Sequence, residues 1–496
     1  MATIDRSSPL PIYHQLKALI QEQIGSGLWR PGDKIPTERE LCQTHAISRS
    51  PVRQALSELA HEGLLVRRPG LGTFVADHGS VDISSEISLQ MMCSDRDWRA
   101  LLDHVSSVWN TSHPDQGIAF EVDVVRHDAF YDLLSAAVGA GTAPDLAMVD
   151  SVWVAGFADA GFLYALEGLG SPWNHSGFGQ GLHEVFVDAN SLGERLYGLP
   201  VKADASLLWY RKDWFTEEGL TPPRDWQDLL HVASHFLQPQ VRERHGLAYP
   251  LAFPGGTAGG EATVYNLMPF AWSAGADVLD GEGSCVTLDA PATRQALQFL
   301  RDVVHHHHVS PTAVIGYHHE TGARLFAEGK VAMALGGSYE AGAIRMAADW
   351  GSEEFSQRVG AASPPAAPGQ GPVSTVGGTS YVILRQCGRP AVVMDVLRLA
   401  TDPDVIGDLY RAARHHLPCP SFKAMRGPDA DPLLSGVSDM IATGRARPAI
   451  PEYVKVSRQL QRMFEAAIGS REPIADIVQR TARFISVITE LRCQSS

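Results

Sequence analysis

The sequence predicts a multidomain protein, with an N-terminal winged helix-turn-helix that is mainly α with a β wing, followed by a two-lobed α/β domain. Three observations lead to this fold class. The first 76 residues hold three helical patterns and a glycine-centred hairpin. From Ile87, short apolar runs alternate with amphipathic ones, and further strand-like runs follow Gly198 and Pro200. We expect domains at 1–76 and 87–496, joined by a polar linker at 77–86.

Composition indicates a globular protein with an uneven charge distribution. The chain has 496 residues, of which 44% are hydrophobic and 20% charged, enough for two or three domains with their own cores. The formal net charge is -15, yet residues 1–78 hold nine Lys and Arg against eight Asp and Glu, and the remainder holds 32 against 48. This asymmetry predicts that only the N-terminal part approaches a polyanion.

Cellular location follows from the absence of an apolar leader pattern. Charged and polar side chains interrupt every apolar run in the first 30 residues, and no later run resembles a membrane span. We therefore expect a cytoplasmic protein without membrane contact. The six cysteines are too far apart for a paired metal-ligand motif and are expected to be reduced.

The N-terminal elements follow from capping and periodicity. Apolar residues at helical spacing predict a first helix over residues 12–24, which ends in SGLWRPGDKIP. Thr37 and Glu40 form a capping box that opens a short second helix. After the THAI turn, Ser48 or Ser50 caps a third helix.

The third helix and the hairpin suit contact with a duplex. Arg49, Arg53 and Gln54 fall on the side opposite the apolar stripe, where guanidinium and amide groups could reach base edges and phosphates. The helix ends at Gly63, and LLVRR-PGLG-TFV predicts two strands about a glycine turn. Such a hairpin can lie against a DNA backbone or minor groove.

The stretch from Pro11 to Val75, including PTERELCQ and SRSPVRQALSELAHEGLLVRRPGLGTFV, resembles the GntR family of bacterial winged-helix transcription regulators. The resemblance implies DNA contacts by arginines of the second and third helices and by a glycine at the wing tip, next to a threonine hydroxyl. It also implies a homodimer on a near-palindromic double-stranded DNA operator. The expected DNA-binding residues are Thr37, Arg39, Ser48, Arg49, Ser50, Arg53, Gln54, Arg68, Gly72 and Thr73.

The next segment predicts the start of a doubly wound lobe. The runs ISLQMM, DWRALLDHVSSVWN, IAFEVDVV, DAFYDLLSAAVGAG and PDLAMVD give the order β-α-β-α-β with a mainly parallel sheet. Ligands of such sheets collect in loops beyond the carboxyl ends of strands. Asp150 and Trp153, in DSVWVAGFADAG, are therefore candidate ligand residues.

A second lobe is expected after RLYGLPVKADASLLWYRKDWF. Its glycine and proline are predicted to break a strand that crosses between the lobes and acts as a hinge, and SLLWYRK to start a second sheet. FAEGKVAMALGGSYEAGAI then predicts a helix, a buried strand and a glycine turn opening another helix. GGTSYVILR predicts a further strand, and long helices are expected near 452–468 and 473–491.

This order resembles extracellular solute-binding proteins of the maltose-binding type, a periplasmic-binding-protein-like fold whose two α/β lobes close on a sugar. Those receptors are exported and this chain shows no export signal, so the resemblance implies a binding module reused inside the cell rather than transport. Trp209 and Tyr210 are adjacent on a strand, so only one of them can face the cleft. The positions that match the ligand loops of the family are Asp150, Trp153, Trp209, Tyr210, Trp272, Gly337, Ser338, Tyr339 and Gly378.

Other chemistries fit less well. Consecutive helical residues point about 100° apart, so the four histidines at 305–308 do not form a compact metal site. GGTAGG lacks the lysine and spacing of a phosphate loop, and FADAGF lacks the serine of a nucleophile elbow. We expect no catalytic residues, no metal and no cofactor.

Together, the two resemblances predict a sequence-specific DNA-binding transcription regulator whose operator affinity is controlled by a carbohydrate bound between the two lobes. Two alternatives to this prediction stay open. One is a GntR-type regulator with an aminotransferase-like domain, which would hold pyridoxal phosphate on a lysine. The lysines beyond the linker do not lie in a phosphate-gripping Ser/Thr-rich stretch; they are Lys202, Lys212, Lys330, Lys423 and Lys455. The other alternative is a solute-binding receptor without a DNA role.

Overall fold

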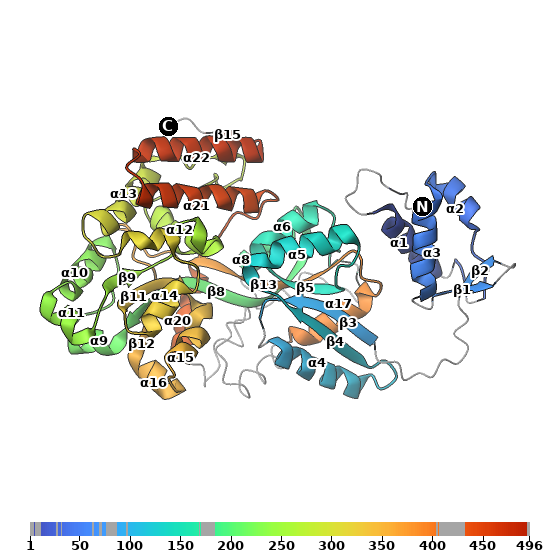
Figure 1. Cartoon of the computed structure of the whole chain (residues 1–496), viewed down its shortest axis with the longest axis horizontal. Helices are drawn as coiled ribbons and strands as arrows, with labels where there is room; N and C mark the ends of the chain where they lie inside the picture. The colour runs from blue at the N-terminus through green and yellow to red at the C-terminus, as the bar shows by residue number, and fades with distance from the viewer. Residues whose placement is uncertain are drawn as a thin grey trace.

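The computed structural model shows a small helical module followed by a two-lobed α/β body (Figure 1). The predicted linker at 77–86, Gly63 and the turn of the wing lie outside the residues that the structure describes. Among the described helices, none is long and apolar enough to cross a membrane. The described residues are 4, 11–25, 28–30, 32–61, 64–68, 72–75, 87–95, 98–167, 169, 184–402, 405 and 432–493.

The N-terminal module has the predicted three helices and hairpin. Thr37 accepts a hydrogen bond from the backbone N–H of Glu40, and the Glu40 carboxylate accepts one from the Thr37 N–H at 2.7 Å, so the capping box is confirmed. The chain before the second helix also joins the wing, since the Ile35 N–H donates to the Thr73 carbonyl at 3.0 Å. The elements are α1 (Ile12–Gly25), α2 (Glu38–His45), α3 (Arg49–His61), β1 (Leu65–Arg68) and β2 (Gly72–Val75).

The first lobe confirms the order β-α-β-α-β. Strand β3 pairs in parallel with both β4 and β5. Four of the five residues of β5 are buried because helices cover both faces of the sheet, as in other doubly wound folds. The elements of this part are β3 (Ile87–Cys93), α4 (Trp98–Ser112), β4 (Ile118–Val124), α5 (His127–Ala140), β5 (Leu146–Asp150) and α6 (Ser151–Asp159).

The connection between the lobes differs from the prediction. We expected the glycine and proline to break this strand, but β8 (Gly198–Arg211) is continuous. Pro200 faces Ser380 of β13 (Thr375–Ile383), next to a shift in the strand register. Such an irregularity accommodates proline, which has no backbone N–H to donate to the neighbouring strand. The first part of β8 pairs with β13, and the last part pairs with β11 (Val331–Gly337) and β12 (Val359–Ala362). The two expected sheets are therefore one, with strand order β4-β3-β5-β13-β8-β11-β9, in which β9 is Tyr249–Ala252.

The second lobe surrounds the far end of this sheet. The predicted helix, buried strand and glycine turn are confirmed as α14, β11 and the turn into α15, and the two long C-terminal helices are α21 and α22. These two helices pack side by side along the top of the second lobe in the view of Figure 1. The second-lobe helices are α9 (Lys212–Glu217), α10 (Trp226–Phe236), α11 (Pro239–His245), α12 (Glu261–Ser273), α13 (Pro291–His305), α14 (Thr321–Ala327), α15 (Ala341–Ala347), α16 (Ser352–Arg358), α20 (Pro432–Ala442), α21 (Tyr453–Gly469) and α22 (Ile474–Thr489).

Short elements complete the body. Helix α17 packs on the first lobe against α4, and its apolar side joins the core beneath β3 and β5. The two-residue strands form small local pairs at the periphery, except β14, which pairs with β13. These elements are α8 (Glu184–Ala189), β6 (Ser191–Leu192), β7 (Arg195–Leu196), β9 (Tyr249–Ala252), β10 (Cys285–Val286), α17 (Pro390–Ala400), β14 (Arg445–Ala446) and β15 (Arg492–Cys493).

Candidate functional site

Helices α2 and α3 present a polar face rich in arginine. Val52, Ala55 and Leu56 are buried in the module, so the opposite side of α3 faces outward as predicted. Arg53 lies on this side, and its Nε is 3.0 Å from a carboxylate oxygen of Glu38 on α2. The predicted residues that are exposed on this face are Thr37, Arg39, Ser48, Arg49, Ser50, Arg53 and Gln54.

The wing lies beside this face and depends on one glycine. Gly72 has φ +124, and a Cβ there would lie 2.6 Å from Cε of Lys34. Thr73 pairs with Arg67 across the hairpin, and the backbone of Arg68 pairs with Gly72. The Arg68 side chain is outside the described part. Lys34 is exposed next to the wing, and its place in PGDKIP shows no pattern that would have revealed it.

A buried ion-pair network joins the two lobes at the carboxyl end of β5. Asp150 caps α6 by accepting a hydrogen bond from the Val152 N–H at 3.2 Å. The guanidinium of Arg447 lies 3.6 Å from Asp150 and donates to Glu261, the first residue of α12, at 2.8 Å. Only 3% of the Arg447 side chain is exposed. One cation is thus shared between a carboxylate of the first lobe and a carboxylate of the second.

Further polar groups surround this pair. The Glu261 carboxylate also accepts hydrogen bonds from the hydroxyls of Tyr453, at 2.6 Å, and of Ser457, both from the first turns of α21. Asp204, in the middle of β8, accepts a hydrogen bond from the Tyr265 hydroxyl at 2.5 Å, and burial raises the pKa of the Asp204 carboxyl. We call this set the interlobe cluster; its members are Asp150, Asp204, Glu261, Tyr265, Arg447, Tyr453 and Ser457.

Glycine residues make room for the interlobe cluster. A Cβ at Gly377 would lie 2.5 Å from Nη2 of Arg447 and 3.4 Å from Oδ1 of Asp204. Gly378 has φ +147, and a Cβ there would lie 1.8 Å from the Lys202 carbonyl oxygen. The paired glycines of β13 therefore permit the close approach of strands and side chains at the crossing between the lobes.

Several of the predicted ligand residues border the interlobe cluster. Asp150 belongs to it, and the ring centroid of Tyr339 is 6.0 Å from that of Tyr265. The Ser338 hydroxyl accepts a hydrogen bond from the Ala205 N–H at 3.2 Å, which places it beside the same part of β8. Gly337 precedes it at the end of β11, and Gly378 lies across β8 on β13.

The predicted tryptophans lie elsewhere. Trp153 stacks on His127 of α5, with ring centroids 5.3 Å apart. Trp272 donates its indole N–H to Asp277 at 3.2 Å and lies beneath the guanidinium of Arg445. Each ring is at least nine-tenths buried, so neither offers an open face for stacking on a sugar.

Trp209 and Tyr210 lie on opposite faces of β8, as strand alternation predicts. Trp209 is fully buried and donates its indole N–H to Glu340 at 3.0 Å. The Tyr210 ring packs against Phe215, and a Cβ on Gly360 would touch it. Core packing thus accounts for both rings, and we remove them from the ligand set that we propose.

Most residues of the interlobe cluster could not be predicted from the sequence. Asp204 lies in the crossing strand that we singled out, but an acidic residue in an apolar strand was the only signal. Glu261 and Tyr453 open buried helices, which gives them no distinctive pattern. Arg447 follows β14 in GRARPAIPE and becomes significant only when the fold brings it against Asp150.

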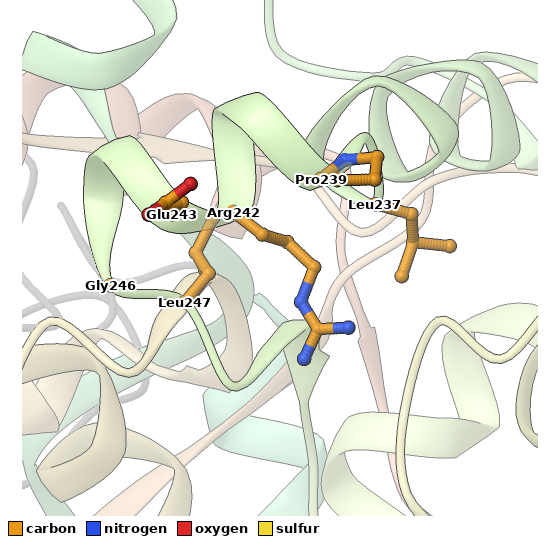
Figure 2. Close-up of a pocket in the computed structure, with 6 residues that line it drawn as sticks. All are labelled: Leu237, Pro239, Arg242, Glu243, Gly246 and Leu247. Atoms are coloured by element: carbon orange, nitrogen blue, oxygen red, sulfur yellow. The ribbon is translucent and has the colours of Figure 1, made fainter.

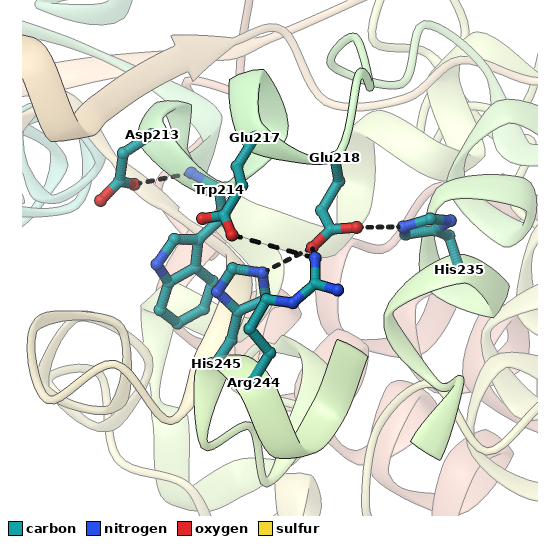
Figure 3. A network of polar contacts seen from close by, with 7 residues as sticks. All are labelled: Asp213, Trp214, Glu217, Glu218, His235, Arg244 and His245. Atoms are coloured by element: carbon teal, nitrogen blue, oxygen red, sulfur yellow. Dashed lines mark hydrogen bonds and ion pairs between the residues drawn. The ribbon is translucent and has the colours of Figure 1, made fainter. Parts of the chain in front are cut away.

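A second polar network lies on the surface of the second lobe (Figure 3). The Glu218 carboxylate accepts hydrogen bonds from Nε2 of His235 and of His245, each at 2.9 Å, and these bonds lower its pKa to about 2. Glu217, Glu218 and His245 are the one group of described side chains close enough to hold a metal ion. The Arg244 guanidinium already lies 2.7 Å from Glu218 and 3.9 Å from Glu217, so it supplies the positive charge. We interpret the network as structural.

The histidine run does not converge on a common point. His305 ends α13, and its Nε2 lies 2.6 Å from the Ile468 carbonyl oxygen. The rings of His306 and His307 meet edge to face. None of these residues belongs to the metal-ligand group found among the described side chains.

A shallow pocket of about 390 Å³ is lined by α11 and the residues that flank it (Figure 2). The guanidinium of Arg242, in its wall, donates to the Ala248 carbonyl at 3.0 Å. The lining residues are Leu237, Pro239, Arg242, Glu243, Gly246 and Leu247. None of them belongs to the predicted ligand set or to the interlobe cluster.

Comparisons with known proteins divide the chain in the same way. Residues 96–406 match the family of bacterial extracellular solute-binding proteins, and residues 12–75 match the gntR family of bacterial regulatory proteins. A putative binding protein of Brucella abortus is 26% identical over 285 residues, which are 57% of this chain and 64% of that protein. The chain therefore spans less than two thirds of the length of this relative.

One further similarity concerns the N-terminal module, and another concerns the two-lobed body. The histidine utilization repressor of Klebsiella aerogenes is 53% identical over 72 residues, which are 14% of this chain and 30% of the repressor. The solved structure of an ABC transporter solute-binding protein from Thermotoga lettingae, bound with α-D-tagatose, is 25% identical with a TM-score of 0.70. That match covers 82% of this chain and all of the other.

Proposed function

The chain belongs to the family of bacterial extracellular solute-binding proteins and carries a gntR-family winged helix at its N-terminus, and from this combination we propose a ligand-responsive transcriptional regulator. It binds DNA sequence-specifically, and a small molecule held between the two lobes controls its affinity for the operator. The observation that carries the proposal is the interlobe cluster, in which Arg447 joins carboxylates of both lobes. This cluster is the natural point at which a ligand would favour one arrangement of the lobes over another.

The proposed DNA contacts lie on α3 and the wing. Arg49 and Arg53 would enter the major groove, where guanidinium groups bind guanine edges and phosphates. Binding would replace the Glu38 partner of Arg53 with DNA, since this exposed ion pair contributes little on its own. Gly72 lets the wing approach the backbone. We propose a homodimer on a near-palindromic operator, in line with how such modules bind.

The proposed ligand is a carbohydrate. Carboxylates, a guanidinium and tyrosine hydroxyls of the interlobe cluster can each hydrogen-bond sugar hydroxyls. The Thermotoga lettingae relative, with its bound tagatose, supports the same class. Because the tryptophans are packed in the lobes, we assign recognition to polar groups, with Tyr339, whose ring centroid is 6.0 Å from that of buried Tyr265, as the nearest partly exposed aromatic ring.

Control of operator affinity requires two arrangements of the lobes that bind the ligand with different affinity. A ligand shifts their equilibrium only by its differential affinity for them. A coupling of about 1 to 3 kcal/mol would change operator affinity roughly 5- to 150-fold. We propose no catalysed reaction and no cofactor: Lys202 lies 3.4 Å from Asp95 and Lys212 donates to the Ser356 carbonyl, so each has a partner within the chain.

The test is a thermal-shift panel of mono- and oligosaccharides on the full chain. A ligand at 100 times its dissociation constant stabilises the protein by about 2.7 kcal/mol. Asp150→Ala should abolish the shift, whereas Asp277→Ala, which alters an exposed ion pair, should keep it. A flat panel would refute the sugar assignment and direct the search to amino acids, peptides and polyamines.

A second experiment tests the DNA half separately. Selection of genomic fragments against random competitor should yield a near-palindromic operator, and the stabilising sugar should change its affinity. A sugar that binds without any operator preference would instead identify a receptor without a DNA role.

A further inference from the structure

Helix α1 of the N-terminal module is seated on the first lobe. Nε2 of His14 lies 2.9 Å from the Gly141 carbonyl oxygen, and the Tyr13 hydroxyl donates to the Ala140 carbonyl at 3.4 Å. These carbonyls end α5, where a helix has unpaired acceptors and partial negative charge. His14 is 8% exposed, so the contact is closed to solvent on most sides. In Figure 1, α1 lies on the side of the module that faces the first lobe.

The fit depends on the absence of a side chain at Gly141. Its φ is +76, and a Cβ there would lie 2.0 Å from the Tyr13 hydroxyl and 2.6 Å from Nε2 of His14. A second approach occurs at Gly388, where a Cβ would lie 3.5 Å from Nε2 of Gln21. Helix α1 therefore meets the first lobe at two glycine positions that are far apart in the sequence.

The other end of α5 packs against the interlobe cluster by way of α6. Trp153 of α6 stacks on His127 and Phe130 of α5, with centroids 5.3 and 5.8 Å apart, and meets Tyr131 edge-on. Helix α6 begins at Asp150, the partner of Arg447. Helix α5 is about 20 Å long, which is enough to connect the two regions as one rigid element.

We propose that α5 transmits the state of the interlobe cluster to the DNA-binding module through the seat formed by Gly141 and His14. This inference rests on the proposed function and specifies its regulation. A ligand that replaces Arg447 as the partner of Asp150 shifts α6, and Trp153 moves α5 with it. The seat then holds or releases α1, which changes the freedom of the module to place its recognition helix. The contacts form a continuous packed path, and a coupling experiment supplies the evidence that such a path requires.

The seat is tested first, by hydrogen exchange on the full chain. His14→Ala removes one donor, and exchange of the α1 amides should be roughly 2- to 10-fold faster, the range expected for one lost hydrogen bond. Gly141→Ala should have the same effect, although its positive φ adds strain within α5. His104→Ala, on an exposed position of α4, is the matched control and should leave α1 unchanged. Unchanged exchange of α1 in His14→Ala would overturn the proposal.

The transmission is tested by a double-variant cycle. Arg447→Met should alter α1 exchange in the wild-type background and have no further effect in the His14→Ala background. Asp150→Asn, which keeps the shape of the side chain, serves if Arg447→Met does not fold. An effect on α1 that is equal in both backgrounds, or absent in both, overturns the proposal. Neither set of exchange measurements requires DNA or a sugar. The result therefore does not depend on whether an operator or a ligand is found.

Discussion

Replacing Arg447 by methionine should destabilise the two-lobed body strongly. Methionine keeps much of the length and apolar stem of arginine but removes the charge. Asp150 and Glu261 then face each other across the interlobe cluster without their shared cation, and Glu261 retains only the hydroxyls of Tyr453 and Ser457. Water reaches these carboxylates poorly, because their side chains are 13% and 19% exposed.

The size of the effect follows from burial. Removing one partner of a buried ion pair costs about 3 to 5 kcal/mol, because the remaining charge is left uncompensated. The partial exposure of Asp150 and Glu261 places the expected loss near the lower end, at about 3 kcal/mol. Arg445 offers a matched control two residues away: its side chain is 45% exposed, and its ion pair with Asp277 should contribute about 0 to 1 kcal/mol.

Urea unfolding of the full chain measures this loss. Circular dichroism and tryptophan fluorescence should be followed together, with a midpoint and slope for each transition, because a multidomain chain need not unfold in one step. In the double variant Arg447→Met/Glu261→Gln, the free energy of unfolding should recover by about 1 to 2 kcal/mol, since one of the two opposed charges is gone.

Three outcomes of this experiment would refute the reasoning. A loss below about 1 kcal/mol would place Arg447 in the same class as surface pairs. A loss equal to that of Arg445→Met would show that the guanidinium is hydrated rather than shared between the lobes. A further loss of stability on adding Glu261→Gln would show that hydrogen bonds to the carboxylate, and not charge repulsion, control stability at the interlobe cluster.

The other predictions concern separate parts of the chain. Arg53→Ala should weaken binding to a selected operator by about 1 to 3 kcal/mol in a gel-shift titration; equal losses on all sequences would assign it to phosphate contact. Gly72→Ala should destabilise the module by more than about 1 kcal/mol, because a residue with a side chain is strained at the φ of +124; thermal unfolding of the full chain measures this. The pKa of Glu218 is about 2 instead of 4.5, so its ionised form adds at most about 3 kcal/mol to the free energy of unfolding above pH 4.5. This contribution is lost as the pH falls toward 2. In urea unfolding, Glu218→Gln should therefore lower the free energy of unfolding at pH 7 and leave it unchanged near pH 2. Burial raises the pKa of Glu340 to about 8, so wild-type stability should fall as the pH rises from 4.5 toward 8; urea midpoints of Glu340→Gln should lack this decline.

Local patterns predicted the N-terminal module well. The capping box joins Thr37 to a residue three positions on, and its hydrogen bonds are those that the motif specifies. The wing required only a glycine between two short strands. The alternation from β3 to β5 was equally accessible, because each element carries its own periodicity.

Long-range contacts account for what sequence reasoning could not predict. The continuity of β8 through Pro200 depends on a register shift in β13, which lies far along the chain. The interlobe cluster joins Asp150 to Arg447, and neither residue has a neighbour that signals the pairing. The surroundings of the tryptophans also depend on tertiary packing: Trp209 and Trp153 have rings of the kind that stack on sugars, but in the structure both are buried within the lobes.

The strand order determines which parts of the chain can fold first during synthesis on the ribosome. The gntR-like module is complete once Val75 has emerged from the ribosome. The edge of β5 stays unpaired until its neighbour β13, whose last residue is Ile383, has been synthesised. At 5 to 20 residues per second, this interval is about 15 to 60 s. During that time the nascent chain holds a folded DNA-binding head and an open sheet edge that attracts other strands. A message cut short in this window would encode the gntR-like module without the solute-binding body that follows it.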